Sequence, residues 1–319
     1  MKVAIVHDYL TEYGGAERVL EALHELWPDA PVFTMVADVS SLGPHKERFA
    51  NWDIRQTGAR LLPFWKQLKS GYRLLAPLFW ETLNFDGYDV VISSTSSYFS
   101  KGILTKPETL HISYIHTPPR FLWGYPSGSN WRQQWWSQLF GLATNPFLRQ
   151  YDVVASQRPD VLVANSTEVA RRIKRLYGRD AEVVYPPVDV EKFSEPPFAK
   201  AEDEEPFFLV VSRLTFAKHV DIAIRAAEKA DVRLKIVGRG SEEKRLRRLA
   251  GVSVTFLGEI SDDRLRALVQ ACTAVLFASE DEDFGMTPVE SMLCGTPVVA
   301  YYGGGYKESV VEGKSGVFF

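Results

Sequence analysis

The sequence predicts an α/β protein of two doubly wound domains in tandem, each with a parallel sheet covered by helices. Three observations predict this class. Short apolar runs of strand length alternate with amphipathic helical segments along the chain. The 319 residues are enough for two domains. A segment rich in proline and acidic residues, 186–206, divides the pattern in two. We therefore expect domains at 1–185 and 207–319, joined by a linker at 186–206.

The first domain opens with an apolar run, Lys2–His7, which predicts a buried strand. Gly14-Gly15 follows this run and opens a helix that extends from Ala16 to about Trp27. Ser166 is expected to be the N-cap of a basic helix, because serine at that position accepts a hydrogen bond from the first turn. The other strands predicted here are Tyr88–Ser93, His111–His116 and Asp160–Asn165.

The second domain repeats the alternation of apolar strands with helices. Its predicted strands are Phe207–Ser212, Val232–Val237, Ser253–Leu257 and Ala274–Ala278. Its predicted helices are Lys218–Ala230, Ser241–Ala250 and Ser261–Ala271, the last with Ser261 as N-cap. Two such domains are expected to bind a ligand in a cleft at the carboxyl ends of their strands.

Composition restricts the possible classes of function. The formal net charge of -3 gives no reason to expect nucleic acid as a partner. The two cysteines, Cys272 and Cys294, lie in apolar helical context, which favours free thiols in a reducing compartment. The first apolar run is too short for a signal peptide, and no window approaches the length of a membrane span. We therefore expect a cytoplasmic protein.

The most informative segment places Glu282 and Glu290 with seven residues between them. A loop that contains Gly285 lies between the two carboxylates and leads into a helix. The helix N-terminus offers N–H groups to phosphate or hydroxyl oxygens, and carboxylates accept hydrogen bonds from sugar hydroxyls. This layout suits a sugar nucleotide. The alternative is an acidic loop before an amphipathic helix, with Phe284 as a core residue.

Two cations, Arg213 and Lys218, follow the first strand of the second domain. Breaking a glycosyl–phosphate bond builds charge on the leaving diphosphate, and two cations aimed at it stabilise the transition state. The alternative is a pair of solvated side chains at a strand end and a helix start. A lysine at a helix N-terminus is unfavourable to the helix dipole, which favours the functional interpretation.

Two glycine-bearing turns follow predicted strands. Gly14-Gly15 allows a backbone to approach phosphate closely, although a plain tight turn would use the same residues. Gly238-Arg-Gly240 resembles part of a dinucleotide fingerprint. Its third glycine is missing, and no acidic residue ends a second strand at the required distance, so we reject a dehydrogenase.

The Glu-x7-Glu run, with the Gly-Thr-Pro-Val strand that follows it, resembles the signature of the retaining GT-B glycosyltransferases of family 4. The resemblance covers Asp8 to Tyr306 and implies two Rossmann-like domains that face a cleft. It implies that Arg213 and Lys218 grip the donor diphosphate, and that Gly14, Gly15 and Gly238 lie near the nucleotide. It further implies that Glu282 and the backbone of Phe284, Gly285 and Met286 orient the sugar, and that Glu290 holds the ribose.

His116 ends a predicted strand, in the run Tyr114-Ile-His-Thr-Pro-Pro-Arg120. A histidine there is commonly a satisfied structural residue. The run resembles the His-Thr-Pro segment of bacterial O-antigen and exopolysaccharide mannosyltransferases, which implies that His116 contacts the donor sugar and that the donor is GDP-mannose. The alternatives are a retaining transferase that uses a UDP-sugar, and a non-catalytic sugar-nucleotide-binding assembly subunit.

The resemblance also implies a reaction and its partners. It implies a retaining hexosyltransferase that needs no metal and no cofactor, and an acceptor that is a saccharide or a polyprenol-linked saccharide in cell-surface polysaccharide synthesis. The basic and aromatic stretch 55–80 suits peripheral contact with an anionic membrane at its inner face, or a core-packed helix with a solvated basic side. Family members usually continue past the position of Phe319, so we expect the C-terminal domain to be incomplete.

Overall fold

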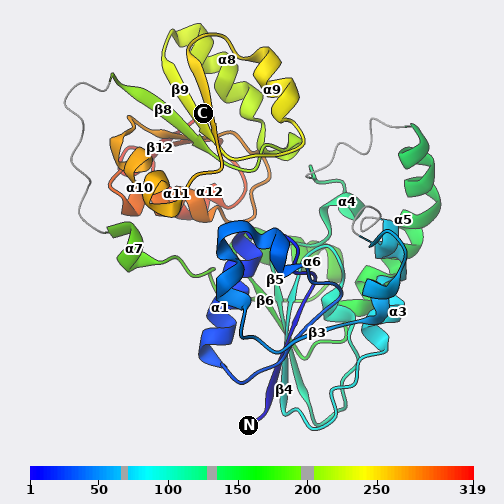
Figure 1. The fold of residues 1–319 in the computed structure, drawn as a ribbon. Coiled ribbons are helices and arrows are strands. Elements are labelled where there is room, and N and C mark those ends of the chain that lie inside the picture. The colour runs from blue at the N-terminus through cyan, green and yellow to red at the C-terminus, as the bar shows by residue number, and fades with distance from the viewer. Residues whose placement is uncertain (66–70, 128–134, 195–204) are drawn as a thin grey trace. The chain divides into compact units, whose positions relative to one another are not determined.

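The structure, a computed structural model, describes residues 1–65, 71–127, 135–194 and 205–319, which form two compact units (Figure 1). The first unit comprises Met1–Tyr125 and Trp135–Pro187, and the second is built on Val188–Phe319. Each unit holds one sheet with its own hydrophobic core. The predicted fold class, two parallel-sheet Rossmann-like units, is confirmed.

In its described residues the first unit has seven strands, all paired in parallel. They are β1 (Val3–His7), β2 (Val32–Thr34), β3 (Ile54–Gln56), β4 (Val90–Thr95), β5 (Leu110–Ile115), β6 (Val161–Ala164) and β7 (Glu182–Val183). Their order in the sheet is β3-β2-β1-β4-β5-β6-β7. The chain moves outward from β1 to β3 and returns to β4 on the other side of β1. The topological switch point, where open α/β sheets bind ligands, therefore lies between β1 and β4.

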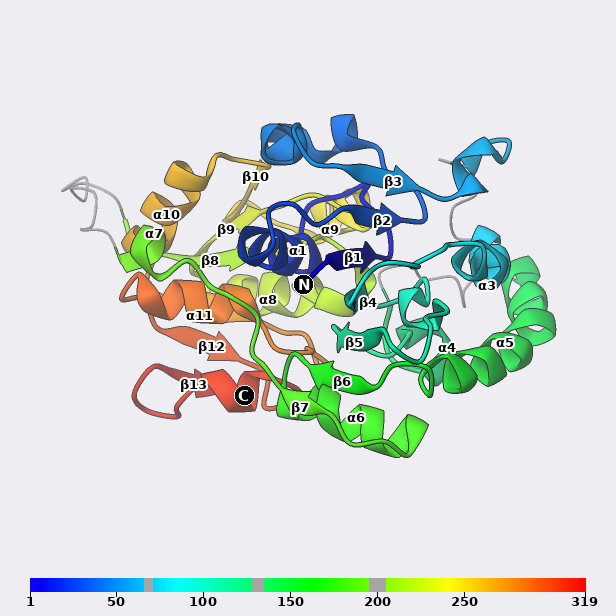
Figure 2. The ribbon, with the colours of Figure 1, turned by 90° about the horizontal axis from the view of Figure 1, so that it is seen from below.

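Alternating side chains of β1 bury both faces of this sheet. Ile5 packs with Leu20 of α1, while Val6 belongs to the core cluster that contains Trp80 of α3 and Leu148 of α5. Figure 2 shows α6 alongside β6 and β7. The α-helices of this unit are α1 (Gly15–Leu26), α3 (Ala76–Glu81), α4 (Arg120–Trp123), α5 (Trp135–Ala155) and α6 (Thr167–Tyr177). Its 3-10 segments are η1 (Val39–Phe49), η2 (Gly58–Leu61), η3 (Gly71–Leu75) and η4 (Ser100–Gly102).

The second unit repeats the architecture with six parallel strands. They are β8 (Phe207–Val211), β9 (Arg233–Val237), β10 (Val254–Gly258), β11 (Val275–Phe277), β12 (Val298–Ala300) and β13 (Gly316–Phe318). Their order is β10-β9-β8-β11-β12-β13, which places the switch point between β8 and β11. The helical elements are α7 (Val190–Ser194), η6 (Phe216–Lys218), α8 (Val220–Ala230), α9 (Glu243–Leu249), α10 (Asp262–Ala271), α11 (Met286–Leu293) and α12 (Tyr306–Ser309).

Two predicted helix caps are present in the structure. Ser166 accepts a hydrogen bond from the backbone N–H of Val169, and Ser261 accepts one from that of Arg264. Each serine satisfies a donor in the first helical turn that would otherwise lack a partner. Cys272 and Cys294 are free thiols, as expected.

The predicted helix 218–230 and the expected linker 186–206 differ from the structure. The predicted helix 218–230 begins only at Val220, because His219 adopts φ 48° and separates η6 from α8. Within the expected linker 186–206, Val190–Ser194 forms α7 and buries Phe193, while 195–204 lie outside the described residues.

The stretch 55–80 is not a single helix. Its described part contains η2, η3 and most of α3, while its residues 66–70, with Lys66 and Lys69, lie outside the described residues. Trp80 is fully buried, and the guanidinium of Arg73 lies over the rings of Tyr98 and Phe121. Part of this stretch is therefore core, as the alternative interpretation expected.

Candidate functional site

The cations and carboxylate predicted for the second unit follow β8 and β11, the two strands that flank its switch point. Arg213 lies two residues after β8, and Lys218 ends η6. Glu282 lies in the loop between β11 and α11. Parallel strands end at the same edge of a sheet, so the fold carries these residues to the edge at which ligands of open α/β sheets bind.

Lys218 and Glu282 form a bidentate ion pair although 64 positions separate them in the chain. The ammonium nitrogen of Lys218 lies 2.9 Å from Oε1 and 2.7 Å from Oε2 of Glu282. The side chains are 25% and 17% exposed, so the pair is shielded from solvent but not sealed. Ser279 reinforces the approach of the two loops by donating a hydrogen bond of 3.1 Å to the carbonyl oxygen of Ala217.

The segment that carries Arg213 is held by the turn after β9. The N–H of Leu214 donates to the carbonyl oxygen of Arg239 over 2.8 Å. Gly238 adopts φ +125°, and a Cβ atom there would overlap the carbonyl oxygen of Ser212. Only glycine allows this approach, so packing by itself accounts for Gly238. The side chain of Arg213 is exposed at this edge.

A run of three glycines supports the Glu282 loop. Gly304 adopts φ +55°, and a Cβ atom added there would overlap the backbone of Glu282. The N–H of Gly305 donates to the carbonyl oxygen of Glu282 over 2.9 Å. Gly303-Gly-Gly305 was not among the residues predicted from the sequence. The signal was present, because consecutive glycines mark a place where two backbones approach closely.

The remaining residues of the Glu-x7-Glu run form the junction between this loop and α11. Phe284 is a buried core residue, so the backbone is the part of this residue that can meet a ligand. Gly285 is the N-cap with φ 89° and lies against the ring of Tyr306. Met286 begins α11, and Glu290 is a 4% exposed residue within it.

In the first unit, Gly14 and Gly15 lie where β1 leads into α1. Gly14 is the N-cap in an extended conformation, and Gly15 is the first helical residue. Neither glycine has a positive φ, and a Cβ at Gly14 would make an ordinary contact of 3.5 Å with Glu17. Neither backbone conformation requires glycine, and the space beside Gly14 would admit a Cβ atom.

His116 follows β5 at the carboxyl edge of the first sheet. The backbone N–H of His116 donates to the carbonyl oxygen of Thr95 over 3.0 Å, and the ring nitrogen Nε2 lies 2.8 Å from the hydroxyl of Ser94. The residue is 9% exposed. Burial, together with nearby His7, lowers the pKa of His116 from 6.5 to about 3, so the imidazole is neutral near pH 7.

Three further polar residues at this edge were missed from sequence. Asp8 accepts hydrogen bonds from the N–H groups of Ser96, Tyr98 and Ser100, which order the loop after β4. Burial raises the pKa of Asp8, but these bonds outweigh it and hold the pKa below its ordinary value. His7 and Glu17 lie next to Ser94 and to the first turn of α1. The signal for Asp8 and Glu17 was their position beside Gly14-Gly15.

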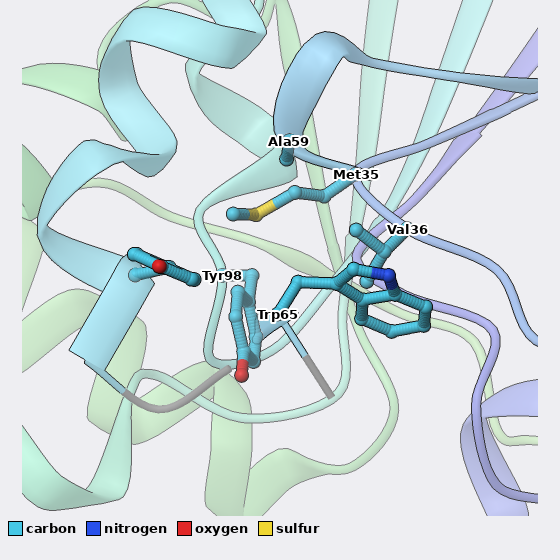
Figure 3. A pocket seen from close by; sticks show the side chains of 6 residues that line it. Met35, Val36, Ala59, Trp65 and Tyr98 are labelled. Atoms are coloured by element: carbon cyan, nitrogen blue, oxygen red, sulfur yellow. The ribbon is translucent and has the colours of Figure 1, made fainter. Parts of the chain in front are cut away.

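The first unit also contains a small apolar hollow (Figure 3). The lining comes from the β2–η1 connection, from η2, η3 and the segment between them, and from the β4–η4 connection. The lining residues are Met35, Val36, Ala59, Trp65, Tyr72 and Tyr98. Among the described residues that line the hollow, none carries a charge that could pair with a phosphate.

The described part of the chain contains neither a cluster of metal ligands nor a membrane-spanning helix. Residues 1–65, 71–127, 135–194 and 205–319 contain no group of three His, Cys, Asp or Glu side chains placed to hold a metal ion. None of the helices in these ranges is both long and apolar enough to cross a membrane.

Two family models match the chain. The model described as Glycosyltransferase Family 4 matches residues 13–192, more than half of the 319 residues. The model described as Glycosyl transferases group 1 matches residues 191–319. The chain therefore belongs to glycosyltransferase family 4.

Curated relatives share part of this sequence. The D-inositol 3-phosphate glycosyltransferase of Acidothermus cellulolyticus is 37% identical over 194 residues, which are 52% of this chain and 43% of the relative. The enzyme of the same description from Mycobacterium tuberculosis strain H37Ra is 35% identical over 177 residues, 49% of this chain and 37% of the relative. The matches thus span less than half the length of these relatives.

Solved structures show the same fold. Anabaena HepE in complex with UDP-glucose aligns with a TM-score of 0.69 at 21% identity, covering 100% of this chain and 85% of that one. Sucrose-phosphate synthase from Thermosynechococcus elongatus aligns with a TM-score of 0.73 at 17% identity, covering 100% and 86%. The fold is therefore that of the GT-B glycosyltransferases.

Proposed function

We propose that this chain is a retaining hexosyltransferase that moves mannose from GDP-mannose to a glycan or lipid-linked saccharide in cell-surface polysaccharide synthesis. The Lys218–Glu282 ion pair is the observation that carries the proposal. It joins a cation suited to a diphosphate and a carboxylate suited to sugar hydroxyls, at the sheet edge where such ligands bind.

The ion pair suggests how a donor is bound. Without a donor, Lys218 and Glu282 neutralise each other. A sugar nucleotide offers each a replacement partner, because its diphosphate takes the ammonium and its hydroxyls donate to the carboxylate. Arg213 adds a second cation for the diphosphate. Gly14, Gly15 and Gly238 lie near the nucleotide, Glu290 holds the ribose, and the backbone of Phe284, Gly285 and Met286 orients the sugar.

The proposed chemistry is a front-face displacement. The bond between the anomeric carbon and the diphosphate oxygen breaks while the acceptor oxygen bonds from the same face, which retains the anomeric configuration. The leaving phosphate oxygen takes the proton of the acceptor hydroxyl. Lys218 and Arg213 stabilise the charge that develops on the diphosphate, and His116 contacts the donor sugar. The reaction requires neither a metal nor a cofactor.

The proposal of mannose rests on the His116-Thr-Pro-Pro segment. A UDP-sugar is the second candidate, because solved structures of HepE contain UDP and UDP-glucose. For the acceptor, a polyprenol-linked saccharide agrees with the proposed role, while the curated relatives are named for D-inositol 3-phosphate.

We also propose peripheral contact with the inner face of the membrane through residues 55–80. Leu61 and Phe64 are 79% and 72% exposed and lie close in sequence to the exposed Arg60. Apolar side chains beside a cation suit an anionic bilayer surface. Sedimentation with vesicles tests the contact: Leu61→Ser with Phe64→Ser should lower binding to anionic vesicles, and unchanged binding would refute it.

The function is tested by incubating the chain with GDP-mannose, UDP-glucose and UDP-N-acetylglucosamine, each with a saccharide or inositol phosphate acceptor, with and without EDTA. The expected result is release of GDP, and an α-linked product by NMR that EDTA does not suppress. Release of UDP would transfer the assignment to the second donor. Nucleotide binding without release from any donor would support a non-catalytic subunit instead.

A further inference from the structure

Four buried polar side chains form a hydrogen-bonded chain in the first unit. A carboxylate oxygen of Glu17 lies 3.4 Å from Nε2 of His7, and Nδ1 of His7 lies 3.0 Å from the hydroxyl oxygen of Ser94. The same hydroxyl oxygen lies 2.8 Å from Nε2 of His116. Glu17, His7 and Ser94 are at most 4% exposed, so water does not compete for these bonds. The chain therefore runs without a break from α1, across β1 and β4, to the end of β5.

The carboxylate at one end sets the direction of every bond. Glu17 only accepts, so the proton on a neutral His7 lies on Nε2 and Nδ1 of His7 is an acceptor. Ser94 then donates its hydroxyl proton to His7 and accepts from His116. His116 consequently carries its proton on Nε2, and its Nδ1 presents a lone pair.

We infer that Glu17, His7 and Ser94 are positioning residues that fix His116 in its Nε2–H tautomer, so that Nδ1 accepts a hydrogen bond from a hydroxyl of the bound sugar. This inference rests on the proposed function. It assigns a purpose to three residues that the proposed reaction does not otherwise use.

The state of the free nitrogen supports this assignment. In the part of the chain that the structure describes, no group hydrogen-bonds to Nδ1 of His116, although the residue is largely buried. The charged and titratable groups that influence this ring are His7 and Asp8, with Glu17 behind His7. The low pKa of His116 keeps the ring neutral, which is the form in which one nitrogen accepts.

The neighbouring residue of β4 provides an internal comparison. The hydroxyl of Ser93 lies 3.0 Å from Nε2 of His111, and both residues are fully buried. Because side chains alternate along a strand, this pair lies on the opposite face of the sheet from Ser94. Among the described residues, Nδ1 of His111 is buried without a hydrogen-bond partner, and no carboxylate continues this pair. The Ser93–His111 pair therefore has the same serine–histidine hydrogen bond as Ser94–His116, but it is fully buried and cannot contact a ligand.

The experiment reads the tautomer directly from histidine ring ¹⁵N shifts and their long-range proton correlations at pH 7. Wild type is expected to show His116 with the proton on Nε2. In Ser94→Ala, the Nδ1–H form should become populated, because the bond that selects Nε2–H is lost. Ser93→Ala removes an equivalent buried bond and should leave the His116 signals unchanged. Wild type with the proton on Nδ1 would overturn the inference without any activity measurement.

Transfer kinetics give the second readout. Losing one neutral hydrogen bond of ordinary strength predicts that Ser94→Ala lowers kcat/KM by about tenfold. Ser94→Thr, which keeps the hydroxyl, should restore the rate, and Ser93→Ala should match wild type at equal folded fraction. Equal losses in Ser93→Ala and Ser94→Ala would mean a purely structural role. If no donor is turned over, the proposed function fails, while the ring shifts still decide the tautomer.

Discussion

Replacing Lys218 by alanine should weaken donor binding far more than it weakens the fold. Lys218 and Glu282 are 25% and 17% exposed, and pairs that retain solvent contact stabilise a protein by about 0.2–1 kcal/mol. A hydrogen bond to a charged group contributes about 1.5–3 kcal/mol, so losing the contact with a diphosphate predicts roughly 10- to 150-fold weaker binding. Urea unfolding and calorimetric titration measure the two effects separately.

The partner substitution should act in the opposite direction on a nucleotide that lacks the sugar. Glu282→Gln releases Lys218 from its bidentate pair, so a nucleoside diphosphate no longer competes with the carboxylate. A gain of about 0.2–1 kcal/mol predicts up to about fivefold tighter binding of the diphosphate. The sugar nucleotide should bind no more tightly than to wild type, because its hydroxyls lose a charged acceptor.

Lys192 provides the matched control. Its ammonium nitrogen lies 2.5 Å from a carboxylate oxygen of Asp262, and its side chain is 29% exposed, close to the value for Lys218. Lys192→Ala therefore removes a comparable ion pair elsewhere in the second unit and should leave nucleotide affinity unchanged. Equal affinity in wild type and Lys218→Ala, or an equal loss in Lys192→Ala, would refute the reasoning.

Three more predictions concern the residues that hold the Glu282 loop of the second unit and the polar groups at the carboxyl edge of the first sheet. Gly304→Ala should lower the free energy of unfolding in urea by more than about 2 kcal/mol, because the cost of φ +55° adds to the overlap with Glu282. Gly313→Ala, at φ +72° and beside open space, should lower it by only about 1–2 kcal/mol. Equal losses would contradict the overlap. Asp8→Asn should lower the free energy of unfolding at pH 7. The difference from wild type should shrink as the pH falls below 3.8, because the unfolded carboxyl is protonated before the folded one. A pH-independent difference would exclude a role for the charge. Finally, His111 and His116, both with pKa near 3, should not titrate between pH 5 and 8 by NMR. Below pH 6.5 they should lower the free energy of unfolding by up to about 2.7 kcal/mol per pH unit, because only the unfolded chain takes up both protons. Titration of either ring near pH 6.5 would contradict its burial.

Much of the fold was predictable because its strongest signals are local. Buried strands such as β1 and β8 are continuous apolar runs, and Ser166 and Ser261 mark helix starts by their own hydrogen bonds. Short strands such as β2, with three residues, carry too little periodicity to be distinguished from loops. The 21-residue helix α5 was missed because Pro146 interrupts its pattern and exposed apolar side chains blur its amphipathic character.

The candidate site was predictable to the extent that its residues lie in short motifs. The ion pair between Lys218 and Glu282 depends on two loops meeting across 64 positions, which spacing alone does not reveal. The contact of Ser94 with His7 spans 87 positions and exists because β1 pairs with β4. Strand order decides which of these residues become partners, and strand order cannot be predicted from local sequence.

The Lys218–Glu282 pair also bears on the end of the catalytic cycle. In the proposed reaction, the carboxylate loses its hydroxyl donors once the hexose has left for the acceptor, and it pairs again with the nearby ammonium. The spent nucleoside diphosphate then competes with the Glu282 carboxylate for the ammonium of Lys218. The fold holds this carboxylate 2.7 Å from the ammonium, at a local concentration that free anions do not reach. In the proposed enzyme this competition lowers the affinity for the by-product by up to about fivefold, so accumulated diphosphate should inhibit it less than it inhibits Glu282→Gln.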